Sequence, residues 1–250
     1  MQKLLPIKLS HVMSLQAEGE GVQVMRAIGI PKVENLDPFL LLDLFNVKLP
    51  AGFPDHPHRG FQTMTYLLSG SIFHEDFKGH KGILGPYDVQ VMTAGKGIIH
   101  AEMPGSFDEP SYGFQLWINL TGQEKYCDPD YKEYTKDKII KLTNEKYEVR
   151  IVVGACDGKK ALIENRTPMD FLDFQIFGNG ETKYKANNKW NTFVIVYEGT
   201  VLINGQKFTK NTAVYFNQAN EGEEVVFQNP SEKESTKFIC VSGNLNLIFS

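Results

Sequence analysis

The chain has 250 residues, of which 42 % are hydrophobic and 12 % aromatic, enough apolar material for one large or two ordinary packed domains. Its 26 basic and 30 acidic residues are mixed along the length and give a net charge of −4, which argues against direct nucleic-acid binding. No apolar run approaches the roughly 20 residues that span a bilayer, and no signal-peptide pattern opens the sequence, so we expect a soluble intracellular protein without membrane contact.

The first half of the chain carries short apolar segments separated by glycine- and proline-rich turns. This pattern predicts strands at Val22–Ile28, Phe39–Phe45, Thr63–Leu68, Ser71–Glu75, Asp88–Thr93, Ile98–Met103 and Gly113–Asn119. Short strands at close, regular spacing are typical of an antiparallel sandwich or small barrel. The polar, tyrosine-rich segment Thr121–Thr143 is predicted to be a linker with one helical turn.

The second half repeats this rhythm. Strands are predicted at Tyr147–Val153, Phe171–Ile176, Thr192–Glu198, Thr200–Ile203, Thr212–Phe216, Val225–Gln228 and Phe238–Ser242. The dipeptide Asn204-Gly205 favours a type I′ hairpin turn. Laying Leu68–Ile72 over Tyr197–Val201 also aligns Asp88–Met92 with Thr212–Phe216, which suggests an internal duplication and two similar barrels.

Two pairs of polar side chains stand out in the first half, His56-Pro57-His58 and His100-Ala101-Glu102. In each pair the residues are two apart, so on a strand both side chains point to one face. If both strands line one barrel, three imidazoles and one carboxylate converge as a set of ligands suited to a first-row transition metal. A single histidine in a β-rich protein is more often a hydrogen-bonded structural residue, but four donors in two such pairs favour a metal site. On the overlay the second half has no equivalent donors.

The segments around these pairs resemble the pirin family of the cupin superfamily. The resemblance is carried by Asp37–Leu41, Gly52–Phe61, His74–Phe77 and Met92–Pro104. It implies an all-β fold of two tandem cupin barrels (double-stranded β-helix, or jelly-roll), with a metal-binding barrel in residues 1–130 and a barrel without ligands in residues 131–250. It also implies one mononuclear iron held by His56, His58, His100 and Glu102.

The donor set itself bears on the choice of metal. Three nitrogen ligands and one oxygen ligand leave one or two open positions on a five- or six-coordinate ion, as a redox or catalytic metal requires. Nickel, manganese, copper or cobalt would accept similar donors. Asp55, Arg59 and Gln62 are the expected residues to orient the imidazoles.

The resemblance implies two activities of different class. One is a quercetin 2,3-dioxygenase, which joins dioxygen to a flavonol-like substrate, with Glu102 as the base for the flavonol hydroxyl. The other is a metal-dependent transcription co-regulator that binds protein partners, in the cytoplasm and, in a eukaryote, the nucleus. The first fifty residues show no basic docking face, so the enzyme is the preferred interpretation, and a monomer is expected.

Four further expectations concern single features. His74 and His80 lack a paired donor and are interpreted as structural, with His74 at the cavity mouth as the alternative. Tyr87 stands where the family pattern has glycine and is expected to change the turn type. The chain also ends without the family's terminal segment. Finally, aromatic and long apolar side chains are expected in the core or in the wall of a substrate pocket: Phe53, Phe61, Met64, Phe114, Leu116 and Trp117.

Overall fold

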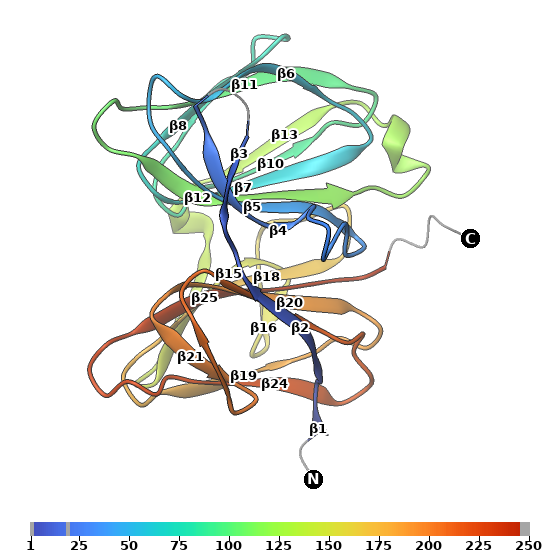
Figure 1. Ribbon diagram of the computed structural model, residues 1–250. Coiled ribbons are helices and arrows are strands. Elements are labelled where there is room, and N and C mark those ends of the chain that lie inside the picture. The colour runs from blue at the N-terminus through green and yellow to red at the C-terminus, as the bar shows by residue number, and fades with distance from the viewer. Residues whose placement is uncertain (1–2, 19–20, 246–250) are drawn as a thin grey trace. The chain divides into compact units, whose positions relative to one another are not determined.

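The computed structural model describes residues 3–18 and 21–245, and these form two β-rich units (Figure 1). Of the described residues, the N-terminal unit comprises 14–18 and 21–138, and the C-terminal unit comprises 3–13 together with 139–245. Apart from two short 3₁₀ turns, Glu124–Tyr126 and Lys136–Lys138, the regular elements of the described part of the chain are strands, as the sequence predicted. Among those residues no helix is long and apolar enough to cross a membrane.

Two facing sheets make up the N-terminal unit. The larger has the order β13-β10-β7-β12-β5-β4-β3 and the smaller the order β6-β11-β8-β9. The strands are β3 (Leu15–Ala17), β4 (Gln23–Ile28), β5 (Phe39–Val47), β6 (Phe53–His58), β7 (Phe61–Ser69), β8 (Ile72–Asp76), β9 (Lys81–Leu84), β10 (Val89–Thr93), β11 (Ile98–Pro104), β12 (Ser111–Asn119) and β13 (Asp130–Tyr134). Buried side chains from both sheets, among them Val24, Phe45, Leu67, Ile72 and Leu84, join the sheets through one apolar cluster.

The C-terminal unit repeats this arrangement. One sheet has the order β14-β15-β18-β25-β20-β23-β2, the second has the order β1-β24-β21-β22 with β19 paired to β24, and β16 and β17 form a small ribbon. The strands are β1 (Lys3–Leu4), β2 (Ile7–Val12), β14 (Ile140–Thr143), β15 (Tyr147–Val153), β16 (Ala155–Cys156), β17 (Lys159–Lys160), β18 (Met169–Ile176), β19 (Glu181–Lys185), β20 (Asn191–Glu198), β21 (Thr200–Ile203), β22 (Gln206–Thr209), β23 (Thr212–Phe216), β24 (Glu223–Gln228) and β25 (Thr236–Gly243). Phe174, Phe227 and Phe238 pack together in its core, with centroid separations of 4.5–5.8 Å.

The orders of the two larger sheets agree with the overlay of the two halves. In each unit the strand before the aligned turn, β7 or β20, lies centrally between the same two partners, β10 and β12 or β23 and β25. One position differs in origin: β13 is the last strand of the N-terminal unit in sequence and pairs with β10, whereas its counterpart β2 lies near the start of the described chain and pairs with β23. The predicted domain boundary at residue 130 does not account for this exchange of β2 and β13 between the two halves of the sequence.

Three local expectations can be compared with the structure. Asn204 and Gly205 have φ of +49° and +79°, as a type I′ turn requires. Tyr87 adopts φ of +67°, a left-handed conformation in which its N–H donates to the Leu67 carbonyl (2.6 Å). The predicted linker is partly a strand, because Asp130–Tyr134 pairs along the whole of β10. The chain's last residues, 246–250, lie outside the described part.

Candidate metal centre

Strands β6 and β11 lie side by side in the smaller sheet of the N-terminal unit and carry the two predicted pairs (Figure 1). Their antiparallel register sets His100 opposite His56 and Ile98 opposite His58. Residues of β11 alternate between buried and more exposed, so His100 and Glu102 both point inward. A register shift between His100 and Glu102 interrupts the pairing with β6 at this point.

The four side chains predicted to converge do lie together. The imidazole centroids are separated by 4.7 Å (His56–His58), 4.5 Å (His56–His100) and 5.0 Å (His58–His100). One ligand atom from each of these histidines lies within 4.8 Å of the others. Glu102 Oε2 is 4.0 Å from His100 Nε2. The three imidazoles thus form one cluster, with the Glu102 carboxylate beside His100.

The hydrogen bonding of the imidazoles leaves nitrogen atoms free to bind a metal. His56 Nδ1 lies 2.8 Å from the Pro54 carbonyl oxygen, to which it can donate, and this leaves Nε2 as the acceptor atom. His58 Nε2 and both ring nitrogens of His100 are buried and have no hydrogen-bond partner among the described residues. Buried polar atoms are normally paired, so these residues fit a metal ion as their missing partner. Gln62, expected to orient an imidazole, donates to Thr93 Oγ1 instead (3.0 Å).

Glu102 is held by two side chains from the facing sheet. Gln115 Nε2 donates to Glu102 Oε2 (3.1 Å), and the Thr65 hydroxyl lies 3.2 Å from Oε1. The same hydroxyl lies 2.7 Å from the Gln115 carbonyl oxygen, and because it has one proton it donates to only one of the two. Burial raises the pKa of Glu102 above its usual value, which makes the carboxylate a stronger base.

The buried imidazoles of His58 and His100 are neutral at neutral pH. Burial, followed by the neighbouring imidazoles, lowers the pKa of His58 and of His100 from 6.5 to about 3. A neutral imidazole has a free lone pair, which is the form that binds a metal ion.

These shifts predict how the stability of the metal-free protein depends on pH. Between about pH 3 and 6.5 the unfolded chain binds more protons at His58 than the folded chain does, so the free energy of unfolding falls as the pH falls through this window. From pH 7 to pH 5 we expect a loss of about 1–2 kcal/mol for this histidine. Urea unfolding of chelator-treated protein measures it. In His58→Gln the loss should be smaller by that amount, and an equal loss in both proteins would contradict the assignment.

A pocket of about 380 Å³ opens over this centre, a size suited to a small organic ligand. Much of its wall is apolar, formed by Val24, Leu41, Phe45, Phe53, Ile72 and Trp117. His56, His58 and Glu102 also line it, as do Arg26 and Asp43. The Arg26 guanidinium donates to both Asp43 oxygens (2.8 and 2.7 Å) and to Glu18 (2.5 Å), so its charge is neutralised within the pocket wall.

Comparison with known proteins decides the family. The Pirin family profile matches residues 21–118. A pirin-like protein of Solanum lycopersicum is 42 % identical over 228 residues, covering 91 % of this chain and 78 % of its own length. Human pirin is 41 % identical over 239 residues, covering 95 % and 82 %. The chain belongs to the pirin family.

Solved structures confirm the tandem cupin fold expected of a pirin. The GK1651 protein of Geobacillus kaustophilus superposes with a TM-score of 0.88 at 26 % identity, over 99 % of each chain. A quercetin 2,3-dioxygenase of Acinetobacter baumannii gives 0.87 at 23 % identity, over 98 % of this chain and 88 % of its own. The pirin YhhW of Escherichia coli, in complex with nickel(II), gives 0.75 at 17 % identity, over 95 % and 100 %.

Several residues of the pirin site were missed or left open by the sequence. Thr65 and Gln115 carry no motif, and only the facing of β7 and β12 toward β11 brings them to Glu102. Of the expected apolar residues, Phe53 and Trp117 line the pocket, and Phe61 packs between His58 and Trp117. The others, Met64, Phe114 and Leu116, are buried core residues.

Proposed function

We propose that this pirin is a metal-dependent dioxygenase that acts on a flavonol-like or other enol substrate. The observation that carries the proposal is the convergence of His56, His58, His100 and Glu102 beside a largely apolar pocket. Neutral imidazoles with unpartnered nitrogens, one buried carboxylate and room for an organic molecule are the parts that such a reaction needs.

The metal proposed for these four ligands is a single iron ion. Three imidazoles and one carboxylate suit iron and leave the overall site charge low, but the same donors accept nickel, manganese, cobalt or copper. The nickel(II) complex of YhhW is consistent with a donor set of this breadth in a protein of the same fold. When bound, the metal would supply Lewis-acid and redox chemistry toward substrate and dioxygen.

The chain's own residues would position the substrate and handle its proton. The apolar wall, including Phe53 and Trp117, would hold a flat aromatic substrate and exclude water. Glu102 would accept the proton of the substrate hydroxyl, because burial strengthens it as a base. Gln115 and Thr65 would keep its carboxylate oriented during that transfer. The similar fold of the Acinetobacter quercetin 2,3-dioxygenases makes quercetin the first substrate to test.

The test is oxygen uptake by protein purified anaerobically and loaded with Fe(II), with quercetin as substrate and elemental analysis of bound metal. We expect one metal ion at this centre and oxygen uptake in the parent. His56→Ala should lose at least about tenfold in metal affinity and in uptake, because it removes a direct ligand. Lys96→Ala serves as the control, because the Lys96 side chain is exposed and its ammonium pairs with the exposed Asp128 carboxylate (3.0 Å).

A regulatory protein that binds partners is the second candidate, and one surface favours it. Phe73, Ile83 and Ile99 point outward from β8, β9 and β11 and are 46 %, 61 % and 47 % exposed. Phe73 pairs across the strands with Ile83 and with Met103, so the apolar side chains form a row on the sheet. Stoichiometric metal with no oxygen uptake over a panel of flavonols would overturn the enzyme and leave this candidate.

A further inference from the structure

A second group of possible metal ligands lies in the N-terminal unit beside the centre described above, since His74 pairs with Glu102 across β8 and β11. It consists of His74 on β8, His80 immediately before β9, and Glu133 on β13. One ligand atom from each lies within 4.8 Å of the other two. None of the three lines the substrate pocket. The group therefore needs its own explanation.

The geometry directs all three side chains to one point. His74 Nε2 contacts Glu133 Oε1 directly, and His80 Nε2 lies 3.6 Å from the same oxygen. The two imidazole centroids are 5.4 Å apart. Ligands at about 2.0–2.2 Å from a common metal ion lie roughly 3–3.5 Å from one another, so small side-chain movements would complete such a site.

The surrounding residues hold two of the ligands in place. Asp76 Oδ1 accepts hydrogen bonds from the backbone N–H groups of Lys78 and His80 (2.9 and 2.8 Å), which fixes the turn that presents His80. Gln90 Nε2 donates to Glu133 Oε1 (3.1 Å). The ring of Tyr131 stacks on both imidazoles, at 5.7 Å from His74 and 4.6 Å from His80. Oriented imidazoles and a hydrogen-bonded carboxylate are the features of supported metal ligands.

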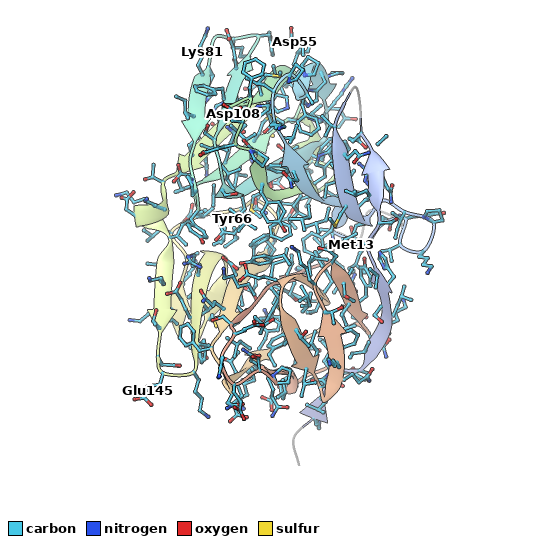
Figure 2. The ribbon with its side chains drawn as sticks, turned by 60° about the vertical axis from the view of Figure 1, so that its left-hand side comes forward. Met13, Asp55, Tyr66, Lys81, Asp108 and Glu145 are labelled. Atoms are coloured by element: carbon cyan, nitrogen blue, oxygen red, sulfur yellow. The ribbon has the colours of Figure 1, made fainter. Side chains whose placement is uncertain are left out.

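Access and charge also suit a cation. The His74 side chain is fully buried, whereas those of His80 and Glu133 are 41 % and 33 % exposed, so one side of the group opens to solvent. Burial lowers the pKa of His74, which keeps its ring neutral and its lone pair available. Lys81, the next residue after His80, has an exposed side chain (Figure 2), and its ammonium pairs with Glu75 (2.7 Å).

Gly82 leaves the space beside the ligands open. It pairs with His74 across β8 and β9, and a Cβ placed on it would lie 2.2 Å from His74 Nε2 and 2.6 Å from Glu133 Oε1. Its φ is not in the left-handed region, so the backbone itself would accept alanine. A methyl group at this position would therefore compete with an ion without removing any ligand.

We propose that His74, His80 and Glu133 form a second metal site, which binds a divalent ion of borderline softness such as Zn²⁺ with water in its remaining position. Two imidazoles and one carboxylate are a common zinc ligand set. The ion would link β8 and β9 of the smaller sheet to β13 at the edge of the larger sheet. The rival explanation is a plain hydrogen bond between His74 and Glu133 with no ion.

The experiment measures zinc per chain after chelation, incubation with excess Zn²⁺ and desalting, in a His56→Ala background that weakens the first centre. Adding His80→Ala, Glu133→Gln or Gly82→Ala should each lower the zinc affinity of the second site at least about tenfold. Each of these variants should therefore retain one equivalent of zinc fewer per chain after desalting. Glu75→Gln, a change of an exposed carboxylate on β8, should remove none. Co²⁺ in place of Zn²⁺ should give a visible absorption band that the same three changes abolish.

Circular dichroism establishes that each variant is folded, and the exposed position of His80 makes its removal the mildest of the changes. Equal zinc content and equal Co²⁺ spectra in His56→Ala and in His56→Ala with His80→Ala would overturn the second site. The result is independent of the proposed oxygenase activity, since neither readout requires turnover.

Discussion

Glu102→Gln is expected to lower the rate of quercetin-dependent oxygen uptake by about 10²–10⁴-fold, the usual contribution of a positioned general base. Glutamine has nearly the same shape as glutamate but cannot accept the substrate proton. The three imidazoles remain, so Fe(II) should still bind at saturating concentration, although more weakly. The measurement compares oxygen uptake at equal metal loading, determined by elemental analysis on the same samples.

The control is Glu75→Gln, which makes the same chemical change at an exposed site on β8 and should leave uptake unchanged. A Glu102→Gln protein that binds one Fe(II) and retains more than a tenth of the parent rate would show that Glu102 is not the base. Loss of both metal and activity would instead identify Glu102 as an essential ligand, without support for its role as a base.

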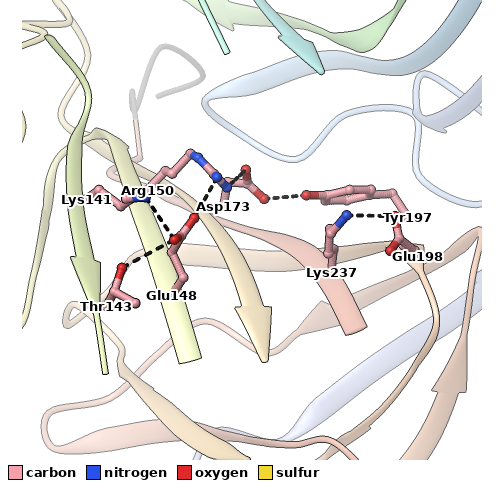
Figure 3. Close-up of polar contacts among 8 residues, drawn as sticks. All are labelled: Lys141, Thr143, Glu148, Arg150, Asp173, Tyr197, Glu198 and Lys237. Carbon is pink, nitrogen blue, oxygen red and sulfur yellow. Dashed lines mark hydrogen bonds and ion pairs between the residues drawn. The ribbon is translucent and has the colours of Figure 1, made fainter. Parts of the chain in front are cut away.

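Asp173→Ala is expected to destabilise the C-terminal unit by about 3–5 kcal/mol. The Asp173 side chain on β18 is fully buried and lies within a polar network on one sheet (Figure 3). The Tyr197 hydroxyl donates to Asp173 Oδ1 (2.6 Å), and Arg150 Nη1 donates to Oδ2 (3.4 Å). Removing the carboxylate takes one partner from the largely buried Arg150 guanidinium and one from the buried Tyr197 hydroxyl, and the loss of a charged partner inside a buried polar network costs more than most lost contacts.

Urea unfolding measures this loss. The matched control is Lys237→Ala in the same region, which breaks the more exposed pair with Glu198 (3.0 Å) and should cost no more than about 1 kcal/mol (Figure 3). Arg150 also contacts Glu148 (2.6 Å), so part of its charge remains paired in the Asp173 variant. A change below 1 kcal/mol for Asp173→Ala would show that the network adds little to stability.

Much of the fold could be predicted because strand periodicity and turn residues are local signals. The Asn204-Gly205 turn follows from the ease with which both residues take positive φ. Tyr87 shows the limit of this reasoning: tertiary contacts hold a tyrosine in a conformation that favours glycine. The strand at Asp130–Tyr134 was also missed, because its polar, half-exposed sequence has no apolar alternation.

The meeting of His56, His58, His100 and Glu102 was predictable for a similar reason. Each pair shares a strand face, so only the adjacency of two strands had to be inferred. The group of His74, His80 and Glu133 offered no such signal. Its members come from a strand, a turn and the segment taken for a linker, and only the packing of the two sheet edges brings them together.

The exchange of β2 between the halves of the sequence has a consequence for how the chain is made. Residues 14–138 are continuous in sequence, and the strands of this unit pair with one another, so the unit can fold while the rest of the chain is being synthesised. The larger sheet of the C-terminal unit cannot be completed during synthesis in the same way, because Ile7–Val12 is synthesised long before its partner strand, Thr212–Phe216. Until Thr212–Phe216 has been synthesised, the backbone groups of Ile7–Val12 lack their sheet partner, so this pairing is a long-range contact that must form late.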